Sequence, residues 1–363
     1  MKRIFAIVLC IVMALSVVAC GNTPAESTPA GNNNQTPAEQ TYKLGMGIVV
    51  SMGSTKTGNA QVDATVAAVV TDADGKIVMC RIDVAQNKMT VTDGLVDTAK
   101  TFETKMELGD RYGMAGKVDN DGNGVMKEWY EQTKAFEAWV VGKTADEVKN
   151  MQTQEAGGHI IAVDQALLDA GCSMQITDFR DAVVKACADA QGMTFKTAAA
   201  FTLGVAAKTT ADESTAATAE AEGTVKMYTD FAASVVADGK IIATLNDAIQ
   251  PQIKINAAGE CTPAEFKGTK RELKEGYNMA PAVNYGPNYD PNNDGKVLEW
   301  YLQSEAFSKH VVGMTAAEVA AMATATNALG YQMTTDADLL AAGCTIQITA
   351  IKAVVAQSAT NAR

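Results

Sequence analysis

The chain has 363 residues, a formal net charge of -12 and 47% hydrophobic residues. That apolar content is enough to build globular cores. The acidic balance excludes nucleic-acid binding, because phosphate backbones repel such a surface, as do anionic lipids and wall polymers. It suits a cationic ligand only where the charge is focused in a cleft.

The N-terminus has the pattern of an export signal. Three residues with two positive charges precede an apolar run over residues 4–18, and Cys20 follows a small residue. We therefore predict a signal peptide over residues 1–19. The small residue before Cys20 resembles the lipobox of bacterial lipoproteins. That resemblance implies lipidation of Cys20 and a chain anchored to the outer face of the cell membrane. An ordinary signal peptide with a chance cysteine is the alternative.

Residues 20–41 are rich in Asn, Thr, Pro, Gly and Ala and almost lack large apolar side chains. Such a segment cannot bury enough surface to offset the entropy of ordering, so we expect a disordered tether. No later segment is long and apolar enough to predict a membrane-spanning helix.

The rest of the chain contains an internal repeat. Residues 128–136 read Glu-Trp-Tyr-x-Gln-x-x-Ala-Phe, and residues 299–307 repeat this pattern. Both copies then continue into Val-Val-Gly-x-Thr-x-x-Glu-Val and, later, Leu-Leu-x-Ala-Gly-Cys-Ser/Thr. The repetition predicts two tandem homologous domains, repeat 1 over residues 42–192 and repeat 2 over residues 201–363.

Each repeat begins with segments that favour strands, over residues 42–50 and 201–206. The next runs, 63–71 and 231–236, lead into Asp-Gly-Lys-Ile, and Asp-Gly between β-branched runs is typical of a hairpin. Repeat 2 has a longer polar turn over residues 209–223. Further strands are expected over residues 88–91 and 252–256.

The second half of each repeat favours helices. They are expected over residues 97–112 and 267–277, then 125–141 and 297–312, and last 178–190 and 350–361. Capping boxes at Thr144-x-x-Glu147 and Thr315-x-x-Glu318 predict a short helix between the last two. Strands followed by helices favour an α+β fold with an antiparallel sheet in each repeat.

Three features carry a family resemblance: the Asp-Gly-Lys-Ile hairpin, a helix ending in Tyr-x-Met, and a small-Gly-x-Ser/Thr turn before an Ala-Val-Val helix. They resemble the FMN-binding domain of ion-pumping redox complexes and of tandem flavin lipoproteins from anaerobic Gram-positive bacteria. Clostridial lipoproteins that share Glu-Trp-Tyr-x-Gln are more similar still. The resemblance implies an FMN-binding-like fold and a hydroxyl, at Ser173 or Thr345, that can be esterified to flavin phosphate. Leu167 and Leu339 stand where that family carries an Asp.

A flavin site is also plausible chemically. Backbone N–H groups of a glycine turn before a helix can bind phosphate, and aromatic side chains can wall an isoalloxazine ring. Covalent flavin, non-covalent flavin or another small ligand, and a purely structural role stay open for these residues. The candidate cofactor-binding residues are Gly171, Ser173, Gly343, Thr345, Trp129, Tyr130, Trp300 and Tyr301.

Equivalent acidic loops precede the repeated helix. Oxygen ligands at alternate positions before a Gly are typical of an EF-hand calcium loop, although Tyr stands where that loop has its last Glu. An Asx turn that caps the next helix explains the same residues without metal. The candidate calcium ligands are Asp119, Asp121, Asn123 and Glu128, and Asp290, Asn292, Asp294 and Glu299.

Five cysteines remain beyond Cys20. Their odd number and unequal placement predict free, mostly buried thiols and a reducing or anaerobic setting, with a Cys172–Cys187 bridge as the alternative. The chain has two His, at non-equivalent positions, which disfavours a repeated zinc site or a His-based triad. No sequence motif indicates catalysis, so we do not expect an enzyme.

These features favour a surface-anchored binding or carrier lipoprotein. In one version it takes part in flavin-linked electron transfer outside the membrane, with a redox partner or membrane complex. The alternatives are a non-catalytic surface interaction module with calcium-stabilised loops, and a protein that captures a solute for a neighbouring transporter.

Overall fold

The computed structural model describes residues 38–279, 298–327 and 330–363. The predicted signal peptide, Cys20 and the predicted tether up to residue 37 lie outside the described residues. Strand β1 begins at Gln40, inside the range predicted as tether. The chain from Ala38 to Arg363 forms one compact unit. No helix in the described ranges is long and apolar enough to cross a membrane.

Three strands of repeat 1 and β6, which follows repeat 1 in the chain, form a four-stranded antiparallel sheet with the order β3-β2-β1-β6. The left-handed Gly75, with φ of 76°, lies in the predicted hairpin between β2 and β3. Residues 88–90 of the strand predicted over residues 88–91 are in a strand, but they form the end of β3 and not a separate strand. The strands are β1 (Gln40–Ser51), β2 (Asn59–Thr71), β3 (Ile77–Thr90) and β6 (Met193–Thr197).

Repeat 2 builds a three-stranded sheet in the order β10-β9-β7, from β7 (Thr202–Thr210), β9 (Tyr228–Ala237) and β10 (Lys240–Ile249). Pro251 follows β10 and has no N–H for the ladder. The predicted strand over residues 252–256 therefore belongs to a different sheet, in which β11 (Gln252–Ile255) pairs with β8 (Gly223–Lys226) and β12 (Cys261–Pro263).

Within the described residues, the helical halves of the two repeats contain the same succession of elements. In repeat 1 they are α1 (Lys105–Leu108), η1 (Gly109–Tyr112), α2 (Trp129–Val140), α3 (Ala145–Lys149), β4 (Thr153–Ala156), β5 (His159–Ala162), α4 (Gln165–Asp169) and α5 (Thr177–Cys187). In repeat 2 they are α6 (Lys270–Leu273), η2 (Lys274–Tyr277), α8 (Trp300–His310), α9 (Ala316–Ala320), β13 (Thr324–Thr326), β14 (Gln332–Thr334), α10 (Ala337–Ala341) and α11 (Thr349–Thr360).

The predicted helix over residues 97–112 is wrong in its first half. Residues 97–104 are not helical, and α1 begins only after a capping box between Thr104 and Glu107. The same box, Thr269 with Glu272, starts α6. The predicted capping boxes at Thr144 and Thr315 are confirmed, since each hydroxyl accepts the N–H of the Glu three residues later.

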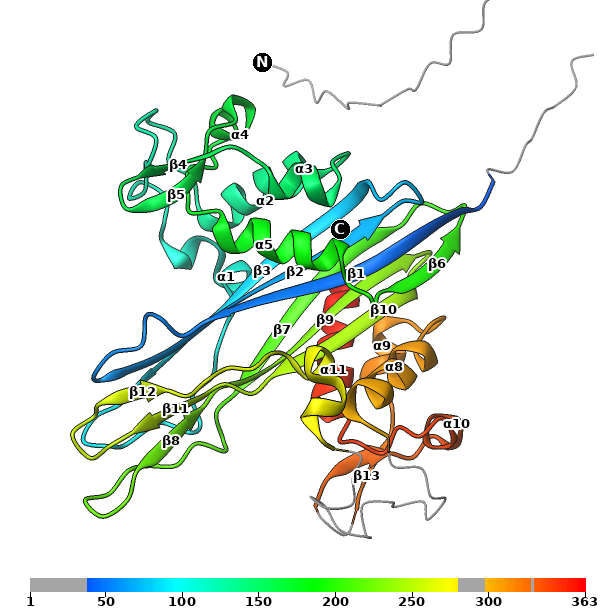
Figure 1. The fold of residues 1–363 in the computed structure, drawn as a ribbon. Helices are drawn as coiled ribbons and strands as arrows, with labels where there is room; N and C mark the ends of the chain where they lie inside the picture. Colours follow the sequence, from blue (N-terminus) through cyan, green and yellow to red (C-terminus); the bar gives the residue numbers. More distant parts are fainter. Residues whose placement is uncertain (1–37, 280–297, 328–329) are drawn as a thin grey trace, which may run out of the picture. The chain divides into compact units, whose positions relative to one another are not determined.

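The two sheets pack face to face, and the helices of each repeat cover the outer face of its own sheet (Figure 1). Alternation along β1 shows this arrangement: Leu44, Met46 and Ile48 enter the core shared by both repeats, whereas Gly45 and Gly47 face α5. The fold is therefore mixed α and β with antiparallel sheets, and its central core belongs to both repeats.

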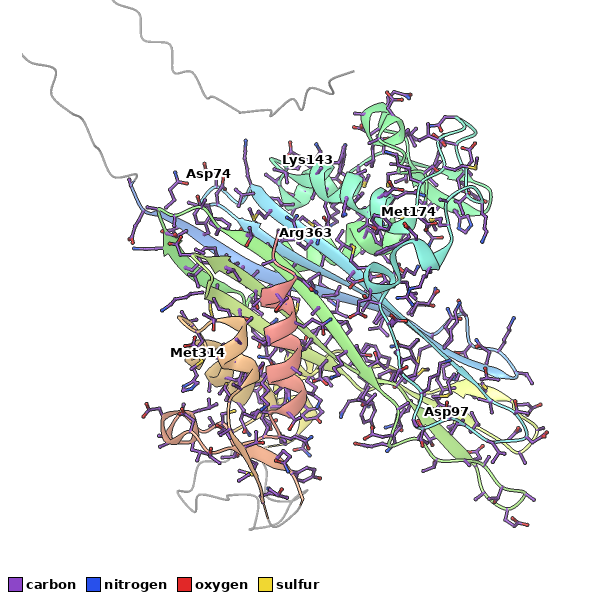
Figure 2. The ribbon with its side chains drawn as sticks, turned by 180° about the vertical axis from the view of Figure 1, so that it is seen from behind. Asp74, Asp97, Lys143, Met174, Met314 and Arg363 are labelled. Carbon is purple, nitrogen blue, oxygen red and sulfur yellow. The ribbon has the colours of Figure 1, made fainter. Side chains whose placement is uncertain are left out.

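Equivalent contacts join each repeat to the other. Lys185 of α5 forms an ion pair of 2.5 Å with Glu272, and Gln357, at the matching place on α11, donates to Glu107 at 2.6 Å. After α11, Arg363 reaches repeat 1, where its guanidinium donates to Glu137 of α2 at 3.0 Å (Figure 2). The repeats thus meet like the two subunits of a symmetric dimer.

Candidate functional site: two equivalent pockets

The repeated Glu of Glu-Trp-Tyr-x-Gln holds the turn that follows η1 or η2. Glu128 accepts the N–H groups of Met114 and Ala115 at 2.9 and 3.0 Å. Glu299 accepts the N–H of Met279 at 2.9 Å. Both Glu side chains are buried and act inside the protein.

The repeated Gln holds the Gly-Cys-Ser/Thr turn. Gln132 Oε1 accepts the N–H groups of Ser173 and Met174 at 3.1 and 3.0 Å. In repeat 2, Gln303 Oε1 accepts the N–H of Thr345 at 2.7 Å. The turn needs its glycines, since Gly171 and Gly343 have φ of 83° and 86°.

This geometry does not fit an esterified flavin at the predicted hydroxyls. Ser173 and Thr345 are only 1% and 5% exposed, and the turn N–H groups expected to hold phosphate already bond to Gln132 or Gln303. A phosphate at this turn would first have to displace the Gln carbonyl. The prediction of a phosphate site at Gly171, Ser173, Gly343 and Thr345 is therefore not supported by the turn.

The repeated Tyr and Trp point to different places. Tyr130 is bonded to Asp110, and Tyr301 donates to Glu275 at 2.8 Å, so each Tyr ties α2 or α8 to the preceding short helix. Neither Tyr lines the pocket of its own repeat described below. Trp129 and Trp300 are 2% and 4% exposed, and both form pocket floors.

The acidic loop of repeat 1 closes on itself. Asp119 accepts the N–H groups of Asn123 and Gly124, and Asn123 donates to Asp121 at 2.8 Å. Glu128 bonds elsewhere, as described above. These contacts are those of an Asx turn, and no group of three or more His, Cys, Asp or Glu among the described residues is arranged to hold a metal. Asp290, Asn292 and Asp294 lie outside the described residues.

All five predicted free cysteines are free thiols in the structure, with no Cys172–Cys187 bridge. Burial raises the pKa of the Cys172 and Cys344 thiols to about 12. Because the thiolate is the reactive form, these two side chains act as small core residues.

A cavity of about 410 Å³ opens in front of Trp129 in repeat 1; we call it the first pocket. Its floor is apolar and its walls come from β2, β3, α1 and the start of α5. The residues that the argument uses are Asp63, Gln86, Lys105, Met114, Gln175 and Asp178.

Repeat 2 contains an equivalent cavity of about 470 Å³ in front of Trp300, the second pocket. Four further residues repeat the first pocket at matching positions: Gln250, Lys270, Met279 and Gln347. The carboxylates differ, because Ala350 replaces Asp178 and Asp230 of β9 lies where repeat 1 has Thr65.

The surroundings of two pocket carboxyl groups raise their pKa values. Burial raises the pKa of Asp178, and repulsion from Asp181 and Asp63 raises it further, against the pull of Lys105. Burial also raises the pKa of Asp230, and Lys270 and Lys208 oppose that rise. A positive charge nearby stabilises the ionised form of a carboxyl group in such a setting.

No family model, curated protein or solved structure matches the chain. The chemistry of the pockets themselves must therefore carry any functional conclusion.

The sequence patterns predicted Trp129 and Trp300 as site residues. They did not predict the charged residues that line the same pockets. Lys105, Asp63 and Asp178 come from segments far apart in the chain. A usable signal was present for the lysine, since Thr-Lys-x-Glu-Leu occurs in both repeats.

Proposed function

We propose that this chain is an exported, lipid-anchored and non-catalytic binding protein that holds one small organic ligand in each repeat. The observation that carries the proposal is the recurrence of one pocket, with the same Lys, Met, Trp and two Gln, in both halves of the chain. Export and anchoring at Cys20 rest on the sequence.

The pockets have the character of ligand sites. Their volumes of about 410 and 470 Å³ fall within the range of known sites, roughly 300–1,000 Å³. Each combines an apolar floor with a few convergent polar groups, which is how proteins orient small molecules. Membrane anchoring would make such a protein suitable for delivering a solute to a neighbouring transporter.

Flavin-linked electron transfer remains the alternative, with FMN held non-covalently in the pockets and a redox partner or membrane complex nearby. This version needs FMN to bind. Purified protein that stays colourless and does not quench the fluorescence of added FMN would remove it.

Calcium at the Asp119 loop is a separate, subordinate proposal. The specific observation is that Asp121 Oδ1 is buried without a hydrogen-bond partner among the described residues. Millimolar calcium should then raise the melting temperature of the wild type but not of Asp121→Asn. An equal response of the two proteins would remove the metal.

The experiment for the proposed function is to count ligands. Thermal-shift screening of amino acids, dipeptides, FMN, nucleosides and monosaccharides identifies a binder, and isothermal titration then gives its stoichiometry. We expect two ligands per chain.

Pocket-filling variants locate the ligands. Gln86→Trp should remove one ligand, Gln250→Trp the other, and the double variant both. Gln165→Trp, on the exposed face of α4, is the matched control. A ligand whose stoichiometry is unchanged by the double variant would refute the proposal.

A further inference from the structure

One wall of each pocket presents a fixed ammonium group. Lys105 Nζ lies 5.5 Å from the ring centre of Trp129 and 4.8 Å from that of Tyr112. Lys270 Nζ lies 5.1 Å from Trp300 and 4.9 Å from Tyr277. Contact with the ring faces holds each ammonium at the pocket edge. In the first pocket the N–H groups of Lys105 stay able to donate to a bound anion.

Another wall presents carboxylates. In the first pocket Asp63 is steadied by the Gln61 amide, which donates to both of its oxygens at 3.0 and 2.8 Å, and Asp178 comes from the first turn of α5. In the described structure no ion pair joins Lys105 to Asp63 or Asp178. The opposite charges therefore face a common cavity without neutralising each other directly.

We infer that the first pocket binds a zwitterion, an α-amino acid or a short peptide, whose carboxylate meets Lys105 and whose ammonium meets Asp178, beside Asp63. An apolar side chain of this ligand lies on the Trp and Met floor. This inference rests on the proposed function and names the ligand class of the first pocket.

The charge distribution separates this class from others. A phosphate-bearing ligand such as FMN would bring two negative charges beside Asp63 and Asp178, against one lysine. In the first pocket an uncharged sugar would leave Lys105 and the two aspartates without charged partners. A zwitterion offers a carboxylate to the lysine and an ammonium to the aspartates. Both contacts are charge-assisted hydrogen bonds, which are stronger than hydrogen bonds between neutral groups.

Three probes with one apolar body test the inference. L-phenylalanine carries both charges, phenethylamine lacks the carboxylate, and 3-phenylpropionate lacks the ammonium. The test uses the full chain with Gln250→Trp, which leaves only the first pocket open. Titration calorimetry and tryptophan fluorescence should show phenylalanine binding at least about tenfold more tightly than either analogue, because each lost contact is charge-assisted. Either analogue binding as tightly as phenylalanine would overturn the inference.

Variants assign the charges. Lys105→Met keeps an apolar stem over the rings and should abolish the preference for phenylalanine over phenethylamine in the first pocket. Asp178→Asn should abolish the preference over 3-phenylpropionate in the first pocket. Lys134→Met is the matched control, because Lys134 makes the same kind of contact with Tyr130, at 4.9 Å, outside the pocket. An unchanged preference in Lys105→Met would also overturn the inference.

The two proposals fail differently. If FMN or a sugar binds with a stoichiometry of two and is displaced by the pocket-filling variants, while no probe shows the charge preference, the ligand class is wrong and the binding function stands. If the filling variants displace nothing, the binding function itself is wrong.

Discussion

At the scale of single residues, Glu-Trp-Tyr-x-Gln ties four parts of each repeat to one helix start. The Glu holds the turn after η1 or η2, the Trp forms the pocket floor, the Tyr reaches the short helix, and the Gln holds the closing turn. The packing roles of these residues thus explain why both repeats retain the pattern. Of the four, only the Trp would contact a ligand in the proposed pockets.

Replacing Gln132 tests this role. Gln132→Ala leaves the N–H groups of Ser173 and Met174 without an acceptor in a buried place, and each unpaired group costs about 1–3 kcal/mol. Urea unfolding should show a total loss of about 2–6 kcal/mol for the two groups. Gln165→Ala, at an exposed position, should unfold like the wild type; equal stability of the two variants would contradict the assignment.

Two equivalent buried carboxylates should make stability depend on pH. Asp83 accepts the N–H groups of Val84 and Met106, Asp247 accepts those of Ala248 and Arg271, and burial raises the pKa of both carboxyls from 3.8 to about 6. Because the folded pKa lies above the unfolded one, their contribution is present below about pH 4 and is lost as the pH rises through about 6.

The double variant Asp83→Asn/Asp247→Asn lacks these titrations. Its free energy of unfolding, relative to the wild type, should rise between about pH 4 and about pH 7, by on the order of 3 kcal/mol per site. Urea unfolding at several pH values measures this difference. A difference that stays constant across the range would show that the two carboxyls do not titrate as described.

At the scale of elements, α5 and α11 lie directly on glycines of the first strand of each repeat. A Cβ at Gly45 would stand 2.0 Å from the Ala186 carbonyl oxygen, and one at Gly204 would stand 1.9 Å from that of Ser358. Both neighbours are helix backbone, so the helix as a whole would have to move.

Gly45→Ala should therefore lower stability by about 1–3 kcal/mol or more, as overpacking does. Thermal unfolding measures the loss. Gly276→Ala is the matched control, because a Cβ there would meet no atom within 4 Å. A Gly45→Ala protein as stable as the control would mean that α5 does not press on β1.

The elements that sequence patterns identified are the long ones. Strands with β-branched runs, the hairpin turns, and α2, α5, α8 and α11 all follow periodicity or strong turn chemistry. The hairpins β4-β5 and β13-β14 and the helices α4 and α10 were missed, because segments of three to five residues are too short to show a period. Strand β6 was missed because its place beside β1 depends on a partner far away in the chain.

At the scale of the whole molecule, the inner faces of both sheets form one core. Leu44, Val66, Leu203 and Phe231 belong to the same buried cluster, although they come from different repeats. Each repeat taken alone would expose that face to water, and exposed apolar patches of this kind drive association.

Separate production of residues 38–200 and 201–363 tests the shared core. We expect each half to be unfolded or to self-associate, and the two halves to form a stable one-to-one complex when mixed. Size-exclusion chromatography and circular dichroism measure both outcomes. A half that is monomeric and melts cooperatively near the temperature of the full chain would show that the repeats are independent.

The sequence alone determined the duplication, the longer strands and helices of each repeat, the capping boxes at Thr144 and Thr315 and the mixed α and β class, because these follow from local periodicity and turn chemistry. Only the tertiary structure decided that the repeats share a core, that Ser173 and Thr345 are buried, and that Lys105 faces Asp63 and Asp178 across a cavity. Such facts depend on which distant segments come together, and a chain's local pattern does not specify that.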